Sequence, residues 1–298
     1  MSIGHKKRRK KSMQDWILDI IIYSLLIFLA IACFYPLWYV VVASFSSSRY
    51  IASQGAFLLW PEEFSLKAYE LAFKDGDIMG GFRNSVLIEV LSLPINIVLT
   101  MLCGYFLASS GMKLKKPITA YIMFTMFFSG GLAPAYLNIK SLGLYDTIWA
   151  LVLPGALSVY NAIICKTAIE GIPESLSESA FIDGANDWQI LWKIILPLIK
   201  PTAAVLLLYY GVSHWNAWFN ASIYLKSGSD LTPAQLVLRR IMIKGGALAN
   251  EAGDAEFSLY AETIQYAAVV IITIPILCVY PFLQKHFAKG VMIGAVKG

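Results

Sequence analysis

The sequence has little charge for its length, and this shortage limits the classes of protein it can encode. Only 14% of its 298 residues are charged, whereas 58% are hydrophobic. Soluble domains average about 25% charged and about 45–50% apolar residues. A soluble fold of this size would have too few charges for its surface. The composition therefore argues against a soluble globular protein and indicates one that lies in a membrane.

Several patterns that carry chemistry are also missing. The sequence has no phosphate-binding loop of the G-x4-G-K-[S/T] type, no HExxH zinc motif and no paired aspartates in apolar segments. It also lacks the repeated glycines of a channel selectivity filter. The four cysteines lie far apart and form no CxxC pair. We therefore expect no catalytic residue, no metal site, no enzymatic activity and no ATP hydrolysis by this chain itself.

What the sequence does contain is a series of long apolar blocks. Six of them can cross the hydrocarbon layer, about 30 Å thick, as helices. We expect an all-α integral membrane fold with six transmembrane helices. The predicted spans cover residues 16–42, 84–109, 117–137, 145–167, 202–222 and 264–283. Pro134 follows Ser129-Gly130-Gly131, which predicts an early break near the outer end of the third span.

The basic residues predict the orientation of these spans. Residues 1–15 form a basic N-terminus that contains the run Lys6 to Lys11. An N-in, C-in topology places 15 of the 24 Lys and Arg residues in the cytoplasm, as the positive-inside rule favours. Such a run can also bind nucleic acid. The apolar span that follows favours a membrane flank instead, so we expect membrane lipid, and no nucleic acid, as a partner.

The cytoplasmic stretch 168–201 carries the most informative pattern. Pro173, and Ser175 with Glu178, predict the start of a short helix with a capping box. Acidic residues lie on its predicted polar face, where anionic lipid would repel them, so a protein partner is favoured over an interfacial lipid contact. The predicted apolar stripe consists of Ala180, Phe181, Gly184, Ala185 and Trp188.

The same stretch contains Glu178-Ser179-Ala180, then Gly184 after three residues, then Ile194 and Leu196-Pro197 after nine more. This pattern resembles the EAA motif of ABC importer permeases, which has the form E-A-A-x3-G-x9-I-x-L-P. Ser179 in place of the middle Ala is the one departure, and it exchanges one small residue for another. Segments similar to the sugar-importer branch are Phe34-Tyr35-Pro36-Leu37-Trp38, Asn84-Ser85, Trp215-Asn216 and the ending Gly294-Ala295-Val296-Lys297-Gly298.

The resemblance implies a type I ABC importer permease fold over residues 16–298, in a bacterial plasma or inner membrane. Its implied partners are a second homologous permease, two cytoplasmic ATPases and an extracytoplasmic solute-binding protein. ATP and magnesium would be bound by the ATPases, so this chain would hold no cofactor. The implied cargo is an oligosaccharide or a polysaccharide fragment. The residues implied to couple to the ATPase are Glu178, Ser179, Ala180, Phe181, Ile182, Asp183, Gly184, Ile194, Leu196 and Pro197.

The outer loop 223–263 would, by the same resemblance, meet the solute-binding protein. Arg239 and Arg240 can face an acidic partner or a uronate-bearing glycan. Alternatively, they can pair with the acidic residues that follow them, which are Glu251, Asp254 and Glu256. The full set implied to contact the binding protein is Leu231, Thr232, Pro233, Arg239 and Arg240.

Polar residues within the spans suggest a path for the cargo. A charge in mid-membrane costs about 2.5–3.5 kcal/mol, so Glu89 either lines a cavity or pairs with another helix. Trp215, Asn216 and Asn220 mark the outer half of the fifth span. Aromatic faces pack on sugar rings and amides bond hydroxyls, so these residues can form a sugar path. An interfacial aromatic belt is the alternative.

Two other functions stay open at this point. A permease of the same kind could carry a solute other than sugar, and the sugar-branch resemblance argues against that. A self-sufficient transporter would need no ATPase, and the predicted docking helix argues against it.

Overall fold

The computed structural model describes residues 12–54, 57–61, 63–74, 76–109, 114–251 and 262–279. Within these ranges the regular structure is helical, apart from one isolated antiparallel bridge between Ser46 and Phe64. The expectation of a helical fold is therefore confirmed for this part of the chain. The basic run at Lys6 to Lys11 lies outside it, as do the end of the sixth predicted span and the ending Gly294 to Gly298.

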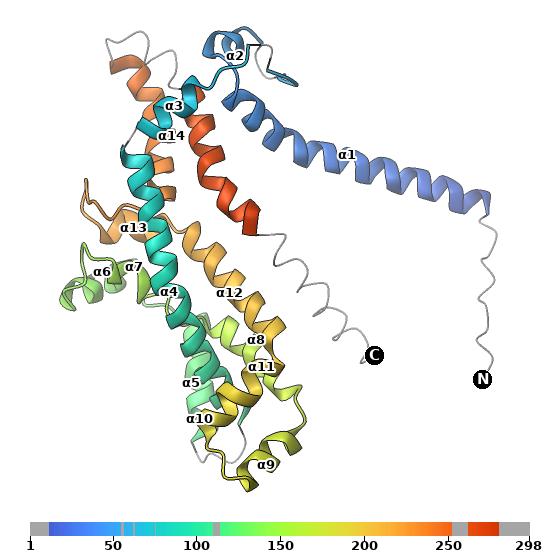
Figure 1. Ribbon diagram of the computed structural model, residues 1–298, viewed down its shortest axis with the longest axis vertical. Helices are drawn as coiled ribbons and strands as arrows, with labels where there is room; N and C mark the ends of the chain where they lie inside the picture. Colours follow the sequence, from blue (N-terminus) through green and yellow to red (C-terminus); the bar gives the residue numbers. More distant parts are fainter. Residues whose placement is uncertain are drawn as a thin grey trace.

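Three uninterrupted helices are long and apolar enough to cross a membrane: α1 (Met13–Ser44), α4 (Gly76–Ala108) and a C-terminal helix at Glu262–Val279. They lie where the first, second and sixth spans were predicted. None of the most apolar stretch of α1 is buried, and a helix that is apolar all round suits a lipid or protein environment. In Figure 1, α1 projects away from the other helices and approaches them at its C-terminal end.

The third predicted span is broken, as expected. Helices α5 (Lys115–Phe127) and α6 (Leu132–Ser141) meet at an angle of 114°. Gly131, between them, has a φ of 87°, which favours glycine. A second bent pair joins the stretch Asp187–Leu198 to α12 (Lys200–Trp215) at 88°. The described part of the chain thus holds three continuous spans, or five if each bent pair counts as one.

The fourth predicted span, 145–167, is also divided. It contains α7 (Trp149–Val152) and α8 (Val159–Glu170), and residues 153–158 between them are not helical. Pro154, followed by Gly155, accounts for the interruption, because neither residue supports a helix interior. The remaining helices are α2 (Ser48–Gln54), α3 (Lys67–Lys74), α9 (Glu174–Ile182), α10 (Asp187–Gln189), the π-helix η1 (Ile190–Ile195), α11 (Leu196–Leu198), α13 (Phe219–Tyr224) and α14 (Ala234–Glu251).

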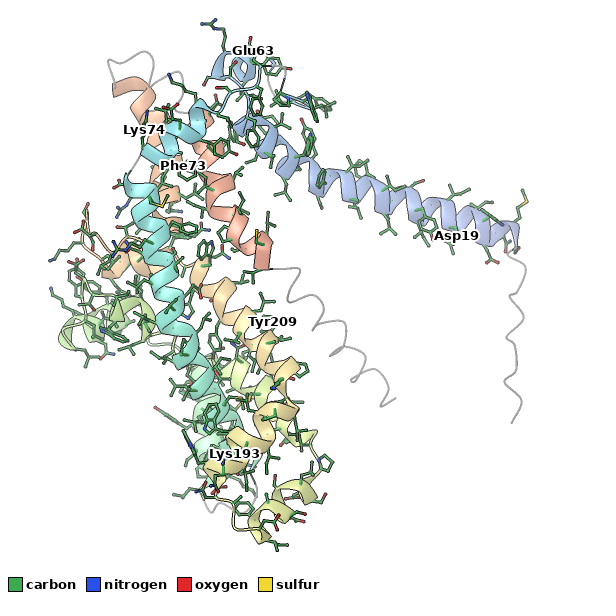
Figure 2. The ribbon with its side chains drawn as sticks, viewed as in Figure 1. Asp19, Glu63, Phe73, Lys74, Lys193 and Tyr209 are labelled. Atoms are coloured by element: carbon green, nitrogen blue, oxygen red, sulfur yellow. The ribbon has the colours of Figure 1, made fainter. Side chains whose placement is uncertain are left out.

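Two main apolar clusters organise these helices. The first, which we call the inner cluster, joins α4, α8, α9, η1 and α12. The outer cluster joins α3, α4, α14 and the C-terminal helix. Helices α9 and α10 lie at one end of the long axis, and α2, α3 and α14 lie toward the other (Figure 1). Figure 2 accordingly shows Lys193 near the first end and Glu63, Phe73 and Lys74 near the second.

The aromatic segment of α1 that resembles sugar importers holds the chain that follows α2. The Tyr35 hydroxyl accepts a hydrogen bond from the Leu58 backbone N–H at 3.1 Å. The Trp38 indole N–H donates to the Leu59 carbonyl at 2.9 Å. The ring of Tyr35 also stacks on Phe57. These contacts fasten the C-terminal half of α1 to residues 57–59.

Helices α4 and α8 pack closely against each other at Gly104. A Cβ atom added there would lie 2.6 Å from Sγ of Cys165 and 2.8 Å from its Cβ. Small residues permit such close approach between membrane helices. Gly104 is therefore a packing requirement of the inner cluster.

Replacing Gly104 by alanine should lower the stability of the protein. The added methyl group collides with Cys165, and overpacking of this kind costs about 1–3 kcal/mol. The melting temperature of the purified chain in mild detergent should fall. Gly80→Ala is the matched control, since a Cβ at Gly80 meets nothing within 4 Å on the same helix. Equal melting temperatures for the two variants would contradict the assigned contact.

Candidate functional site

Helix α9 carries the first half of the predicted coupling segment. It begins at Glu174 directly after Pro173, and no side chain caps its first turn. The predicted capping box of Ser175 and Glu178 is therefore wrong. A capping side chain must stand before the first helical residue, whereas Ser175 is already the second residue of the helix. Glu174 instead places a negative charge in the first turn, where the helix dipole favours it.

The end of α9 is a Schellman turn centred on Gly184. Its φ is 84°. The Gly184 N–H donates to the Phe181 carbonyl at 3.0 Å, and the Ala185 N–H donates to the Ala180 carbonyl at 2.9 Å. This pair of bonds defines the motif, and glycine is the residue best suited to its left-handed position. Gly184 thus turns the chain sharply and ends the helix.

A second helix starts immediately after this turn. The Asn186 side chain accepts a bond from the Gln189 N–H at 2.9 Å, and the Gln189 side chain accepts one from the Asn186 N–H at 3.1 Å. This reciprocal capping box opens α10. The predicted apolar stripe from Ala180 to Trp188 therefore does not form one helix face. It is divided between two helices because α9 ends at the Gly184 turn and α10 starts after Asn186.

The residues of α9 divide into buried and exposed groups. Ala180 is only 8% exposed and packs in the inner cluster. Phe181 and Ile182 are 51% and 86% exposed, although both are large and apolar. Glu178, Ser179, Asp183 and Gly184 are exposed as well. An adjoining hollow of about 520 Å³ has acidic side chains in its lining, namely Glu170, Glu174, Glu178 and Asp187. The end of the molecule thus offers apolar side chains beside concentrated negative charge.

The second half of the predicted coupling segment, Ile194 to Pro197, lies beside the inner cluster. Ile194 and Leu196 are partly buried against the inner cluster, whereas Pro197 is exposed. The Tyr105 hydroxyl at the end of α4 donates to Asp187 Oδ1 at 2.6 Å. The structure therefore connects the α9–α10 turn to α4 by a hydrogen bond and to α12 through the 88° bend.

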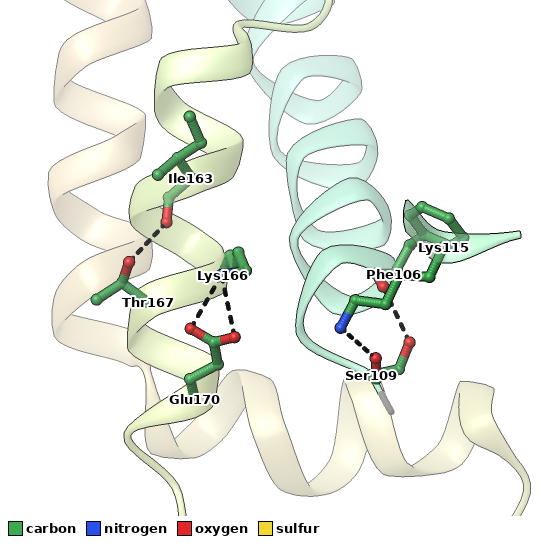
Figure 3. Close-up of polar contacts among 7 residues, drawn as sticks. All are labelled: Phe106, Ser109, Lys115, Ile163, Lys166, Thr167 and Glu170. Carbon is green, nitrogen blue, oxygen red and sulfur yellow. Dashed lines mark hydrogen bonds and ion pairs between the residues drawn. The ribbon is translucent and has the colours of Figure 1, made fainter. Parts of the chain in front are cut away.

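The neighbouring helix ends are held by local polar contacts (Figure 3). Lys166 Nζ lies 3.1 Å from Glu170 Oε1 in the last turn of α8. The Thr167 hydroxyl donates to the Ile163 carbonyl at 3.0 Å. Lys115 Nζ, at the start of α5, donates to the Ser109 carbonyl that follows α4. Partly exposed ion pairs such as the first contribute little, so these contacts mainly fix local geometry.

Toward the other end of the molecule, Asn84 and Ser85 of α4 shape the turn that precedes α14. The Asn84 amide donates to the Asp230 carbonyl at 2.6 Å and to the Thr232 carbonyl at 3.0 Å. The Ser85 hydroxyl accepts from the Ala234 N–H at 3.0 Å, at the first residue of α14. This dipeptide, singled out by its family resemblance, thus positions the predicted binding-protein loop.

Not all of the predicted contact residues in that loop are exposed on the surface. Thr232 and Pro233 are buried, and Leu231 is partly buried. Arg239 is exposed, and its guanidinium lies 3.7 Å from the centroid of the Trp218 ring. Arg240 Nη1 lies 3.5 Å from Thr232 Oγ1. The two arginines therefore have local partners. The predicted pairing with Glu251, Asp254 and Glu256 involves side chains outside the described part of the chain.

The four residues predicted for the substrate path are not gathered at one site. Glu89 and Trp215 line a cavity of about 380 Å³ between α4, α12 and the C-terminal helix. The Trp215 indole donates to the Ile272 carbonyl at 3.1 Å and is buried. Asn216 is exposed and accepts a bond from Gln235 at 3.2 Å, while Asn220 is exposed on α13. Their role in transport stays a prediction.

A buried polar network was missed by the sequence analysis. The Asn96 amide nitrogen donates to the carbonyls of Gly155 and Ala156 at 2.8 and 2.9 Å. Its oxygen lies 3.0 Å from His214 Nε2. These bonds join α4 and α12 to the break in the fourth predicted span. The sequence did hold a signal, because three polar residues recur every four positions in the apolar second span: Ser92, Asn96 and Thr100.

The long apolar helices and the broken spans define a multi-pass membrane protein. The chain matches the family described as the binding-protein-dependent transport system inner membrane component over residues 12–293, and it belongs to this family. The resemblance to ABC importer permeases is thereby confirmed.

The chain is 39% identical over 288 residues to a polygalacturonan/rhamnogalacturonan transport system permease protein of Bacillus subtilis, covering 96% of this chain and all of that protein. It is 24% identical over 296 residues to an arabinooligosaccharides transport system permease protein of Halalkalibacterium halodurans, covering 98% of this chain. A bacterial ABC transporter involved in import of the acidic polysaccharide alginate contains a chain similar in structure, with a TM-score of 0.85 and 30% identity, over 94% of this chain and 99% of that one.

The amide of Asn84 should be required to order the turn before α14. Asn84→Ala removes both hydrogen bonds to the turn carbonyls, each of which contributes about 1 kcal/mol. We expect faster amide hydrogen exchange across residues 229–237, measured by mass spectrometry in lipid nanodiscs. Arg83→Ala, at the exposed neighbouring position, should leave exchange unchanged. Unaltered exchange in Asn84→Ala would contradict the assigned role.

Proposed function

We propose that the chain is one membrane subunit of an ATP-driven importer of oligosaccharides or polysaccharide fragments. A second homologous permease, two cytoplasmic ATPases and an extracytoplasmic solute-binding protein complete the transporter. The observation that carries this proposal is the exposed apolar and acidic surface of α9, tied to two membrane helices by Asp187 and the 88° bend. The relatives whose names specify polygalacturonan and rhamnogalacturonan, arabinooligosaccharides and alginate support the choice of cargo.

In this proposal the chain crosses the membrane six times, with both termini in the cytoplasm. The pair α5 and α6 and the pair α7 and α8 each form one broken span. Broken spans are tolerated where protein groups satisfy the freed backbone, and Asn96 does this between α7 and α8. The positive-inside rule supports the orientation, which assigns α9 to the cytoplasm and α14 to the opposite side. The positions of α9 and α14 toward opposite ends of Figure 1 are consistent with it.

ATP binding would act on this chain through α9. Phe181 and Ile182 enter a groove on one ATPase, and the acidic residues around them pair with basic residues of that subunit. Closure of the two ATPases then moves α9 as a rigid body, because Ala180 is packed in the inner cluster and the Gly184 turn fixes the chain direction. The movement reaches the spans through Tyr105 and the bend before α12. ATP and magnesium are held by the ATPases.

The two remaining partners meet other surfaces. The outer end, with α14 and Arg239, faces the solute-binding protein. Helix α1 carries exposed apolar side chains along its length, and these are covered by the second permease and by lipid. The exposed Arg239 suits an acidic surface of the binding protein.

The docking role of α9 can be tested by Ile182→Asp. Ile182 is 86% exposed, so a carboxylate there should not disturb the fold, but it should weaken contact with an apolar groove. A tagged chain purified in mild detergent with its partners should retain the second permease and lose the ATPase, as measured by quantitative mass spectrometry.

Ile243→Asp is the matched control, because Ile243 is 64% exposed on α14 at the other end of the molecule. It should retain the ATPase. If the Ile182→Asp variant recovers the ATPase in full, the proposal that α9 docks on the ATPase is wrong. Recovery of the unaltered chain alone, or as a homo-oligomer, would favour a transporter that needs no ATPase.

A further inference from the structure

A polar cavity lies between α8 and α12 beside the break at residues 153–158. Its volume is about 450 Å³. Tyr209, which contributes to it, lies on α12 away from both ends of the molecule (Figure 2). None of the residues lining the cavity is an aspartate, glutamate, lysine or arginine. The side chains with polar groups that line it are those of Ser158, Tyr160, Asn161, Tyr209, Tyr210, Ser213 and His214.

Asn161 is the residue that gives this cavity the character of a ligand site. It is only 5% exposed. Its backbone N–H donates to the Ser158 hydroxyl at 3.3 Å, but its side-chain amide has no hydrogen-bond partner among the residues that the structure describes. An amide at the wall of a cavity without a partner is available to a molecule inside it.

His214 also lines the cavity, and its hydrogen bond to Asn96 indicates which ring nitrogen carries the proton. The Asn96 amide nitrogen is fixed as a donor by the carbonyls of Gly155 and Ala156, so its oxygen faces His214. His214 Nε2 must then carry the proton that it donates to Asn96, and Nδ1 of the neutral ring is left as an acceptor. The surrounding bonds therefore fix the tautomer of this histidine.

Two tyrosines supply the apolar part of the wall. Tyr160 and Tyr209 are 56% and 40% exposed, respectively, and both line the cavity. Each offers a ring face together with a hydroxyl group. The lining thus combines an amide, hydroxyl groups, an imidazole and aromatic rings. Such a lining suits a molecule that has many hydroxyl groups and a partly apolar face. A pyranose ring has this chemistry, whereas a lipid tail would leave the polar groups unpaired.

We propose that this cavity is a sugar-contact site of the permease itself, which binds one pyranose ring of the cargo as it crosses the membrane. The inference rests on the proposed function and deepens it. The site is separate from the cavity of Glu89 and Trp215, which lies between other faces of α4, α12 and the C-terminal helix. The lining holds no carboxylate that would repel a uronate ring.

The test uses the complete transporter reconstituted with its partner subunits in liposomes. The probe is a defined mixture of oligogalacturonides, arabino-oligosaccharides and galacto-oligosaccharides. The measured quantity is the number of sugar molecules imported per ATP hydrolysed. Asn161→Ala should lower this ratio about tenfold, because a site built to bond sugar hydroxyls loses one of its polar groups. ATP hydrolysis and recovery of all subunits should be unchanged, since the amide has no protein partner to lose.

Tyr209→Phe should lower the same ratio by a smaller factor. Its matched control is Tyr121→Phe, which removes a hydroxyl from a residue that is 70% exposed on α5, and which should have no effect. An unchanged ratio in Asn161→Ala and Tyr209→Phe would overturn the inference and leave the importer function intact. Loss of the second permease from Asn161→Ala would also overturn it, by showing a contact between subunits. If the unaltered transporter imports none of the probe sugars, the proposed function fails, and the inference fails with it.

Discussion

Backbone carbonyls at membrane depth have no water to bond, and the hydrogen bonds from Asn96 to Gly155 and Ala156 meet this constraint. The break in the fourth predicted span would otherwise leave these groups unpaired in an apolar setting. One amide nitrogen satisfies both carbonyls, and its oxygen engages His214. The Tyr210 hydroxyl completes the arrangement by accepting the Ser158 N–H at 2.9 Å. The packing of α4, α8 and α12 around the break depends on these bonds.

Helix α4 is the element that links the separate functional regions. Asn84 bonds the turn before α14, Asn96 bonds the break before α8, and Tyr105 bonds Asp187 beside the α9 turn. At 1.5 Å per residue, the first and last of these positions are about 32 Å apart along the helix. One continuous helix therefore touches the predicted binding-protein loop, the polar network and the predicted coupling segment. A displacement at either end changes contacts at the other if α4 moves as a rigid element.

The class of protein, a helical membrane protein, could be predicted from the sequence because apolar blocks and the placement of charges are local properties of the chain. The EAA-type pattern identified the predicted coupling segment because its residues are close in the chain, and the coupling role itself stays a prediction. The internal geometry of that segment was harder to predict. Helical spacing alone placed Ala180 and Trp188 on one helix face, but a turn at Gly184 ends α9 before Trp188 is reached. The capping box was misplaced for a similar reason, since Pro173 starts the helix earlier than Ser175 allows.

The polar network and the cavity beside it could not be derived in the same way. Asn96 and His214 are 118 positions apart, and Asn161 is distant from both in the sequence. Their meeting depends on how α4, α8 and α12 pack, and periodicity within one helix carries no information about that. A polar residue every four positions in the second span indicated only that one face of α4 has polar partners. It could not indicate that those partners are the carbonyls of a broken helix.

Helix α12 brings these observations together, because it lines both cavities. Leu207, Gly211 and Trp215 face the cavity of Glu89, whereas Tyr209, Tyr210 and His214 face the cavity of Asn161. The same helix begins at the 88° bend that follows the predicted coupling segment. Any tilt of α12 must therefore alter the shape of both cavities and strain the bonds at His214 and Tyr210. Since close-packed helices rearrange between discrete states more readily than they deform gradually, a push on α9 would be converted into a change of cavity shape within the membrane.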